Sequence, residues 1–262
     1  MSKAEIGIIG GTGVYDPDIL KEKEIVEIDT AYGKPSDSFV VGDYEGRKVA
    51  ILSRHGKSHT LTPHKINYRA NIDAFKQLGV KFILSPCAVG SLQDNIRPGE
   101  FVLVDQFIDR TWGRESTFYD KDKVCHISVA DPACSVLRGI AVESARNLGL
   151  KYHEKGTYLC MQGPRFSTRA ESRLYRSWGA HVIGMTMVPE CVLAREAEIC
   201  YLSIATVTDY DTFKEHPTNI QDIMEVVRKN TDHIKDLITK IIPEIPQERN
   251  CVCSTSLKNA FV

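Results

Sequence analysis

Short apolar runs alternate along the chain with longer stretches in which apolar side chains recur every three or four residues. The short runs are rich in Ile and Val, which is typical of buried strands, and the longer stretches are typical of amphipathic helices. Strands are expected over residues 6–9, 49–52, 80–84, 101–104, 156–161 and 199–207, and helices over residues 62–78, 133–148, 168–178, 188–198 and 220–241. Thr62, followed by Pro63, is the expected N-cap of the first helix. The alternation predicts one three-layer α/β domain.

The repeating pattern ends near residue 246, because Pro243 and Pro246 are expected to stop the last helix. Residues 1–246 are therefore assigned to the domain, and residues 247–262 form a polar C-terminal tail. The composition, 42% apolar and 26% charged, is that of a soluble globule. A net charge of −1 argues against a nucleic-acid or anionic-membrane partner, and no apolar run is long enough to span a bilayer. Residues 1–9 lack the features of a signal peptide, which predicts a cytoplasmic location.

Two carboxylates directly follow the last predicted strand. Asp209 and Asp211 lie two residues apart, and in extended backbone residues two apart point the same way. They could therefore face one ligand together, because ligands of open α/β sheets sit beyond the carboxyl ends of strands. Repulsion between close carboxylates favours a proton on one of them near neutral pH. The alternative is a surface turn, where Asp and Tyr are common.

Other candidate ligand groups also follow predicted strands. The glycine-rich turn at 10–13 could bring backbone N–H groups and the Thr12 hydroxyl to an anion, although it matches neither the Rossmann nor the Walker spacing and a turn without a ligand fits equally well. Arg54 and His55 could clamp an oxyanion or lie in a solvated turn. Phe166 could stack on a planar ligand or belong to a small apolar cluster. Residues 107–119 are expected to form an exposed functional loop.

Seven sequence blocks carry a resemblance when they are taken together. They are I-G-I-I-G-G-T-G at 6–13, R-H-G at 54–56, P-H-K-I-N-Y-R-A-N at 63–71, A-V-G-S-L at 88–92, Q-G-P-R-F-S-T-R-A-E at 162–171, G-M-T-M-V-P-E at 184–190 and T-D-Y-D at 208–211. In this order they resemble the purine nucleoside phosphorylase family and, within it, the 5′-methylthioadenosine phosphorylases. The resemblance implies a central mixed twisted sheet flanked by helices. The cysteine-rich tail resembles the archaeal, heat-adapted branch.

The resemblance also implies roles for single residues. The implied phosphate site contains Thr12, Arg54, His55, Cys87, Ala88 and Thr186. The implied nucleoside site contains Phe166, Met185, Asp209, Tyr210 and Asp211, with the ribose near Met185 and the purine against Phe166. Ser167 and Ile220 match positions that shape the base and 5′ pockets, and His126 matches one that reaches the neighbouring subunit's 5′ pocket. Relatives usually carry Thr or Ser where Cys87 stands, and Ser85 is a possible replacement for that hydroxyl.

The implied reaction is phosphorolysis of the N-glycosidic bond of 5′-methylthioadenosine. His55 and Arg54 would position phosphate, Asp209 would act as the acid at purine N7, and Asp211 would accept from the 6-amino group. No metal or organic cofactor is expected, phosphate is a co-substrate, and the implied assembly is a homotrimer or a dimer of trimers. Two alternatives stay open: a broader purine nucleoside phosphorylase that also uses adenosine, inosine or guanosine, and a catalytically silent nucleotide-binding or scaffold protein.

Eight cysteines are many for a cytosolic chain. Most lie singly in apolar surroundings and are expected to be buried thiols. Cys251 and Cys253 form a C-x-C pair in the polar tail, a spacing that does not match a paired zinc knuckle. Disulfides do occur inside hyperthermophiles, and Cys134 and Cys200 match positions that are bridged in heat-adapted relatives. A Cys134–Cys200 disulfide and a redox-capable Cys251–Cys253 pair are therefore predicted, with buried free thiols as the alternative for the first pair.

Overall fold

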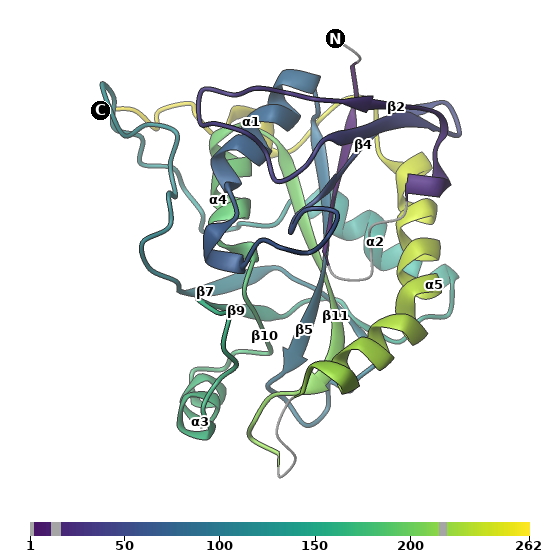
Figure 1. The fold of residues 1–262 in the computed structure, drawn as a ribbon, viewed down its shortest axis with the longest axis vertical. Coiled ribbons are helices and arrows are strands. Elements are labelled where there is room, and N and C mark those ends of the chain that lie inside the picture. Colours follow the sequence, from purple (N-terminus) through teal and green to yellow (C-terminus); the bar gives the residue numbers. More distant parts are fainter. Residues whose placement is uncertain (1–2, 12–16, 215–218) are drawn as a thin grey trace.

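The computed structural model describes residues 3–11, 17–214 and 219–262, and one mixed sheet passes through that part of the chain (Figure 1). The strands are β1 (Ile6–Gly10), β2 (Lys21–Val26), β3 (Phe39–Tyr44), β4 (Arg47–Ser53), β5 (Phe82–Ser91), β6 (Phe101–Leu103), β7 (Gln106–Arg110), β8 (Tyr152–His153), β9 (Thr157–Met161), β10 (Val182–Gly184) and β11 (Cys200–Tyr210). The helices are α1 (Tyr68–Leu78), α2 (Ser135–Asn147), α3 (Arg169–Ser177), α4 (Met187–Glu196) and α5 (Ile220–Glu244). The predicted α/β class is confirmed.

The long strands β5 and β11 run in parallel through the centre of the sheet (Figure 1). The order β2-β3-β4-β1-β5-β10-β9-β7 continues from β5 to both sides, while β11 pairs with β5 and β6 and β6 pairs with β8. β1 is parallel to β4 and β5, whereas β10 is antiparallel to β5. The parallel strands therefore end on one edge of the sheet, where the residues that follow them meet.

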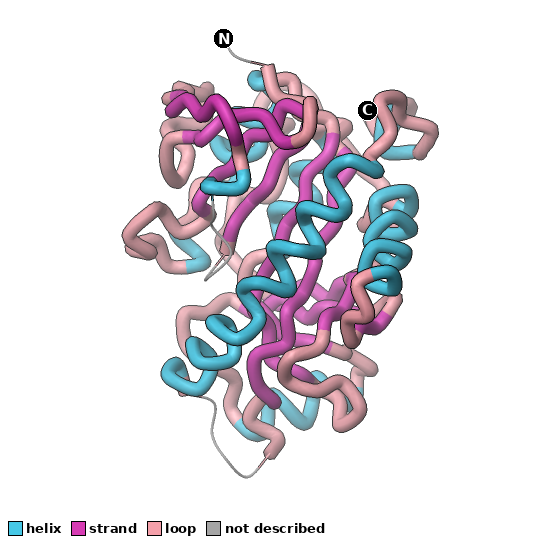
Figure 2. The backbone as a smooth tube through the Cα atoms, turned by 90° about the vertical axis from the view of Figure 1, so that its right-hand side faces the viewer, coloured by secondary structure: helices cyan, strands magenta, loops and turns pink. Residues whose placement is uncertain are grey.

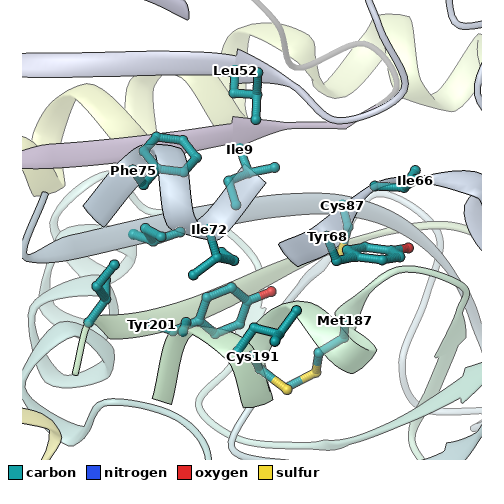
Figure 3. Close-up of a cluster of buried hydrophobic side chains, with 14 of the residues drawn as sticks. Ile9, Leu52, Ile66, Tyr68, Ile72, Phe75, Cys87, Met187, Cys191 and Tyr201 are labelled. Atoms are coloured by element: carbon teal, nitrogen blue, oxygen red, sulfur yellow. The ribbon is translucent and has the colours of Figure 1, made fainter. Parts of the chain in front are cut away.

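Helices cover both faces of the sheet. Side chains alternate along β11, so that Tyr201 and Ala205 join one apolar cluster while Leu202 and Ile204 join the other. The first cluster packs under α1 and α4, as Figure 3 shows for Phe75, Tyr201 and their neighbours. The second packs under α2 and α5, and in Figure 2 α5 lies across that face of the sheet. The result is the predicted arrangement of three layers.

Several element boundaries differ from the prediction. The first helix begins after Asn67, whose side chain accepts a hydrogen bond from the Ala70 N–H, while residues 63–65 form a separate 3-10 turn after Thr62. Pro243 lies inside α5, which continues to Glu244. The strands β2, β3, β7, β8 and β10 were not expected, because they are short or lie where apolar residues do not alternate. β7 occupies the start of the predicted loop at 107–119.

The C-terminal tail packs against the domain. Cys253 is buried in the apolar cluster under α2 and α5, and Phe261 forms a β-bridge with Cys125. Arg47 Nη1 donates to the carbonyls of Ile242 and Ile245, at the end of α5. Among the described residues, no helix is long and apolar enough to cross a membrane.

Neither predicted disulfide is formed in the structure, where all eight cysteines are free thiols. The fold instead brings Cys134, Cys200, Cys251 and Cys253 into one cluster, with all four sulfur atoms within 4.8 Å of one another. Each expected pair thus has the other pair as its neighbour, and the disulfides stay predictions. The predicted burial of Cys134 and Cys200 is confirmed.

Candidate active site

A cavity of about 310 Å³ opens where the parallel strands end. Gly11 follows β1, and Arg54 and His55 follow β4, whereas Met185 and Thr186 follow β10, which runs antiparallel to β5. All of these residues line the cavity. The last part of β5 and the end of β11 complete the wall. The predicted site residues that line the cavity are Arg54, His55, Cys87, Ala88, Phe166, Met185, Thr186, Asp209, Asp211 and Ile220. Thr12 lies outside the described residues.

Arg54 is held below one end of the cavity by a buried carboxylate. Its side chain is 1% exposed, and Nε and Nη2 donate to the two oxygens of Glu190 at 2.8 and 3.1 Å. Nη2 also donates to Ser85 Oγ and the Ile9 carbonyl. Burial is the largest single influence and by itself would lower the pKa of Arg54. The Glu190 carboxylate, through its charge and its hydrogen bonds, and smaller contributions from other groups together raise that pKa far above its ordinary value. The guanidinium is therefore permanently charged and fixed in orientation.

The remaining edge of this guanidinium points toward the glycine-rich turn. Nη1 makes one long hydrogen bond, to the Pro86 carbonyl at 3.3 Å. A Cβ atom added at Gly11 would lie 2.9 Å from Nη1 and 3.2 Å from the Pro86 carbonyl oxygen. Glycine is thus required here, because the backbone passes so close to the cation that no side chain fits between them.

His55 lies beside Arg54 as a neutral imidazole. Burial, with smaller contributions from the Arg54 and His59 charges, lowers its pKa to about 4. Nδ1 is 2.8 Å from the Leu61 carbonyl oxygen, which can only accept, so Nδ1 carries the proton and Nε2 has the free lone pair. The ring stacks on His59 with centroids 4.4 Å apart. His55 can therefore accept a hydrogen bond from a protonated oxygen but adds no charge.

Asp209 and Asp211 lie together at the other end of the cavity. The pairing of β11 with β5 shifts between Val207 and Asp209, so Thr208 is the extra residue of a β-bulge, a feature that re-aims the side chains after it. A Cβ atom on Gly90 would lie 3.5 Å from Asp209 Oδ2 and 3.6 Å from Asp211 Cβ. The two acids therefore share one face of the sheet, as the sequence spacing predicted.

The two carboxylates have different surroundings. Thr208 Oγ1 donates to Asp209 Oδ1 at 2.7 Å, and Asp209 is only partly buried. Asp211 is 3% exposed, and burial raises the pKa of its carboxyl group. Its Oδ2 atom has no hydrogen-bond partner among the described residues. An oxygen in this position can receive a donor from a ligand, since an unpaired buried acceptor is otherwise costly.

Comparison with known proteins defines the family of this chain. A profile of the family described as "Phosphorylase superfamily" matches residues 5–243. The chain belongs to this superfamily. It is 54% identical over 262 residues, all of both chains, to "S-methyl-5'-thioadenosine phosphorylase" of Thermofilum pendens. It is 52% identical to the Nitrosopumilus maritimus protein of the same name, over 98% of this chain and 97% of that one.

Solved structures of phosphorylases share the fold. "Methylthioadenosine phosphorylase sourced from an antarctic soil metagenomic library" is 43% identical and superposes with a TM-score of 0.94, covering 100% of this chain and 93% of its own. The adenine complex of the Schistosoma mansoni methylthioadenosine phosphorylase is 38% identical with a TM-score of 0.91, covering 94% and 93%. A variant of that protein is described as an adenosine/methylthioadenosine phosphorylase in complex with methylthioadenosine. The resemblance inferred from the sequence blocks is thus confirmed.

The middle of the phosphorylase cavity is apolar. Phe166 is 39% exposed at the cavity wall, and Ile220, at the start of α5, faces it with 59% exposure. Met185 presses against Gly163 so closely that a Cβ atom there would overlap its sulfur, and Gly163 also has a φ of +64°. Glycine is therefore required at this turn, and it sets the position of Met185 between the two polar ends.

Cys87 occupies the floor of the phosphorylase cavity as a neutral thiol. Burial raises its pKa, and Sγ lies 3.4 Å from Ser203 Oγ. Ser85 does not supply the hydroxyl that the resemblance implied at the Cys87 position, because its Oγ donates to Glu190 Oε1 at 2.6 Å and accepts from Arg54. Ser85 thus belongs to the network that holds the cation.

Three predicted residues lie outside the cavity lining. Tyr210 alternates away from the two acids, and its ring packs against Phe213 with centroids 6.0 Å apart. Ser167 is buried next to Met161, with Oγ 3.8 Å from the sulfur, so it supports the wall without forming it. His126 is exposed, and its backbone N–H donates to the Ala260 carbonyl.

Two residues with clear roles were not among the predicted site residues. Glu190 fixes Arg54, as described above. Arg114, in the predicted loop, donates through Nη1 to the carbonyls of Met185 and Val188 and through Nη2 to that of Gln162. It thereby joins the segments that follow β9 and β10. Glu190 ends the G-M-T-M-V-P-E block and is an acid within an apolar stretch, which are its only sequence signals, and Arg114 has none beyond its place in the predicted loop.

Proposed function

We propose that the protein catalyses phosphorolysis of S-methyl-5'-thioadenosine to adenine and 5-methylthioribose 1-phosphate. The observation that carries the proposal is one cavity with a fixed cation at one end, two carboxylates at the other and apolar side chains between them. This order matches the parts of the substrates: an anionic nucleophile, a methylthioribose and an adenine. The full-length relatives with this activity in their names support the same conclusion.

The phosphate end would orient the nucleophile. The charge of Arg54 is balanced by Glu190 in the free protein, so phosphate meets a fixed dipole with its cationic edge toward the cavity. His55, neutral at pH 7, would accept from the proton of hydrogen phosphate or from a ribose hydroxyl. Thr186 and the backbone at Cys87 and Ala88 would supply further donors. Positioning of phosphate at C1′ is the main catalytic contribution expected here.

The purine end would stabilise the leaving base. As the glycosidic bond breaks, negative charge develops on the purine ring, and a protonated carboxyl at N7 neutralises it. We assign that role to Asp209 and assign to Asp211 the acceptor for the 6-amino group. The buried Oδ2 atom of Asp211, which has no hydrogen-bond partner among the described residues, supports its role as the acceptor. Phe166 would cover the base, and no metal or organic cofactor is needed for the reaction.

The second candidate is a broader purine nucleoside phosphorylase. Use of adenosine is favoured by the description of the Schistosoma mansoni neighbour as an adenosine/methylthioadenosine phosphorylase. The apolar side chains Met185 and Ile220 favour the methylthio group over a 5′-hydroxyl group, because a hydroxyl would lose its hydrogen bonds there. Inosine and guanosine lack the 6-amino donor and are expected to be poorer substrates.

The assembly and location also remain proposals. A homotrimer, or a dimer of trimers, is expected from the resemblance, with His126 reaching a neighbouring subunit. Its exposure outside the cavity is compatible with that role. A cytoplasmic location is likewise a proposal. Light scattering on the active enzyme tests the assembly, and an active monomer would refute it.

Adenine release from S-methyl-5'-thioadenosine, measured with and without phosphate, tests the function. Release that depends on phosphate and yields a sugar phosphate is expected. Equal release without phosphate would indicate a hydrolase, and no release would leave a nucleotide-binding role. Adenosine and inosine under the same conditions separate the two phosphorylase candidates, with inosine expected to be the poorest substrate.

A further inference from the structure

Three parallel strands end side by side where one wall of the cavity begins (Figure 1). β9 lies between β7 and β10; its ladder with β7 ends at Met161, and its ladder with β10 ends at Gly184. The segments that follow β9 and β10 leave the sheet and carry the cavity-lining residues Pro164, Phe166 and Met185. Because the ladders no longer join these segments, other contacts must set the distance between them.

The side chain of Arg114, in the segment that follows β7, joins the other two segments. Its Nη1 atom donates to the carbonyls of Met185 and Val188 at 2.8 and 2.6 Å, and its Nη2 atom donates to the carbonyl of Gln162 at 2.8 Å. Nη2 also reaches the Met161 carbonyl at 3.4 Å. Since the N–H groups of a guanidinium form a rigid planar fork, this one side chain holds the two segments at a fixed spacing.

Gln162 links Arg114 to the backbone of the segment after β7. Its Oε1 atom accepts from the Trp112 N–H at 3.1 Å and from Arg114 Nε at 3.2 Å, and its Nε2 atom donates to the Trp112 carbonyl at 2.9 Å. The amide side chain therefore takes the place of a backbone residue where the β7–β9 ladder stops. Within the described ranges, Arg114 donates only to neutral oxygen atoms. Its bonds thus hold the backbone of the wall and do not balance a carboxylate.

The phosphate end of the cavity is supported by different contacts. Its cation, Arg54, is fixed by the two carboxylate oxygens of Glu190, and Arg114 takes part in neither bond. On the other wall, Met185 packs directly against Gly163, which belongs to the segment after β9. A change in the spacing of the two segments therefore moves a residue that lines the cavity, while the bonds that hold the cation stay in place.

We propose that Arg114 is a positioning residue for nucleoside binding, an inference that rests on the phosphorolysis proposed above. Arg114 is not among the residues that line the cavity, so it does not touch the substrates. It acts through the backbone of Met185 and of the turn at 162–166, and it thereby sets the width of the slot for the methylthioribose and the purine. Without this link the nucleoside binds more weakly, whereas phosphate still meets its own cation.

Steady-state kinetics of Arg114→Ala and Arg114→Lys test the proposal. The lysine variant keeps the positive charge, but its single ammonium group does not replace the planar fork. In both variants the KM for S-methyl-5'-thioadenosine should rise about tenfold or more and the KM for phosphate should change less than about threefold, because only one wall is displaced. Arg138→Ala is the matched control. Arg138, on α2, is also partly buried and donates to the Glu154 carbonyl at 2.9 Å, and its loss should leave both KM values unchanged.

Two kinetic outcomes would overturn the proposal: equal increases in both KM values, or a wild-type nucleoside KM in Arg114→Lys. Calorimetric titration with S-methyl-5'-thioadenosine in the absence of phosphate needs no turnover, so it tests Arg114 even if the wild-type chain releases no adenine. Binding that weakens about tenfold in Arg114→Lys supports the positioning role, and equal binding refutes it. Failure of the proposed phosphorolysis alone would appear as wild-type binding without phosphate-dependent release, and a wild-type chain that binds no nucleoside would refute both proposals.

Discussion

Glu190→Gln removes the charge that balances Arg54 while keeping the shape of the side chain. Glu190 Oε1 lies within hydrogen-bond distance of Arg54 Nη2, Ser85 Oγ and the Tyr201 hydroxyl, and Oε2 accepts from Arg54 Nε alone. If the glutamine oxygen takes the place of Oε1, it keeps the three contacts of that atom. Its NH₂ group then takes the place of Oε2 and points at Arg54 Nε. One charge-assisted hydrogen bond becomes a donor–donor contact, and a buried cation loses its counterion.

The cost can be estimated from the burial of the pair. Both side chains are 1% exposed, and removal of one partner from such a pair costs about 3–5 kcal/mol. For a chain of this size each kcal/mol lowers Tm by about 2–4 °C, so a decrease of roughly 6–20 °C is expected. Thermal unfolding monitored by circular dichroism, without phosphate, is the measurement.

Glu196→Gln is the matched control. Glu196 is 2% exposed on the same helix, but it accepts from the neutral donors Thr117 Oγ1 and the Phe118 N–H, and burial raises its pKa. Its loss of charge should cost no more than about 1.5 kcal/mol. If Glu190→Gln and Glu196→Gln were equally stable, the electrostatic role of Glu190 would be refuted.

A double variant separates stability from function. Arg54→Met combined with Glu190→Leu replaces both charges by apolar groups of similar size, which is often neutral for stability. Ser85 Oγ and the Tyr201 hydroxyl, 2.9 Å apart, can still bond to each other. The double variant should therefore recover most of the lost Tm while showing no phosphorolysis. Recovered activity would mean that Arg54 is not needed for phosphate.

Four further outcomes are expected. Arg54→Ala should raise the phosphate KM strongly and lower kcat, since a lost charge-assisted bond costs about 1.5–3 kcal/mol, and unchanged phosphate dependence in steady-state kinetics would move the anion site elsewhere. Asp209→Asn should lower kcat on S-methyl-5'-thioadenosine by about 10²–10⁴-fold and narrow the preference for adenine over hypoxanthine nucleosides, which a comparison of the two substrates checks. The pKa of His55 is about 4 in the folded protein and 6.5 ordinarily, so on acidification the unfolded chain binds the proton first. The free energy of unfolding should therefore fall by up to about 3 kcal/mol between pH 6.5 and 4. Denaturant titrations of His55→Gln should show a correspondingly smaller decrease. Gly163→Ala should displace Met185 and raise the nucleoside KM more than the phosphate KM, whereas equal changes in both would argue for a general loss of fold.

The sequence predicts the inner strands and their ends well, because buried parallel strands are continuous apolar runs. The runs at 6–9, 49–52 and 199–207 correspond to β1, β4 and β11, and residues that follow them, among them Arg54 and Asp209, line one cavity. β2 was missed since it is an exposed edge strand, K-E-K-E-I-V, whose backbone pairing with β3 is not encoded in apolar alternation. The bulge at Thr208 was invisible for the same reason: it depends on the partner strand.

Partners that are distant along the chain could not be predicted from local patterns. Glu190 meets Arg54 across 136 residues, and both lie in stretches that also suit other structures. Cys251 meets Cys134 across 117 residues and Cys200 across 51, so the C-x-C spacing alone gave no reason to expect four sulfurs together. Only the folded chain shows which distant groups share a site.

The pairing of β5 with β11 fixes the distance between the two ends of the cavity. Cys87 pairs with Ala205 in the part of the ladder that stays in register from Cys200 to Val207, and Asp209 pairs with Gly90 just beyond the bulge. Neither end can therefore slide relative to the other without breaking hydrogen bonds between the two strands. Variation in substrate choice within this scaffold must therefore arise on the opposite wall. There Phe166 and Ile220 belong to a loop and a helix start outside that ladder, and they can change without altering the spacing between nucleophile and leaving group.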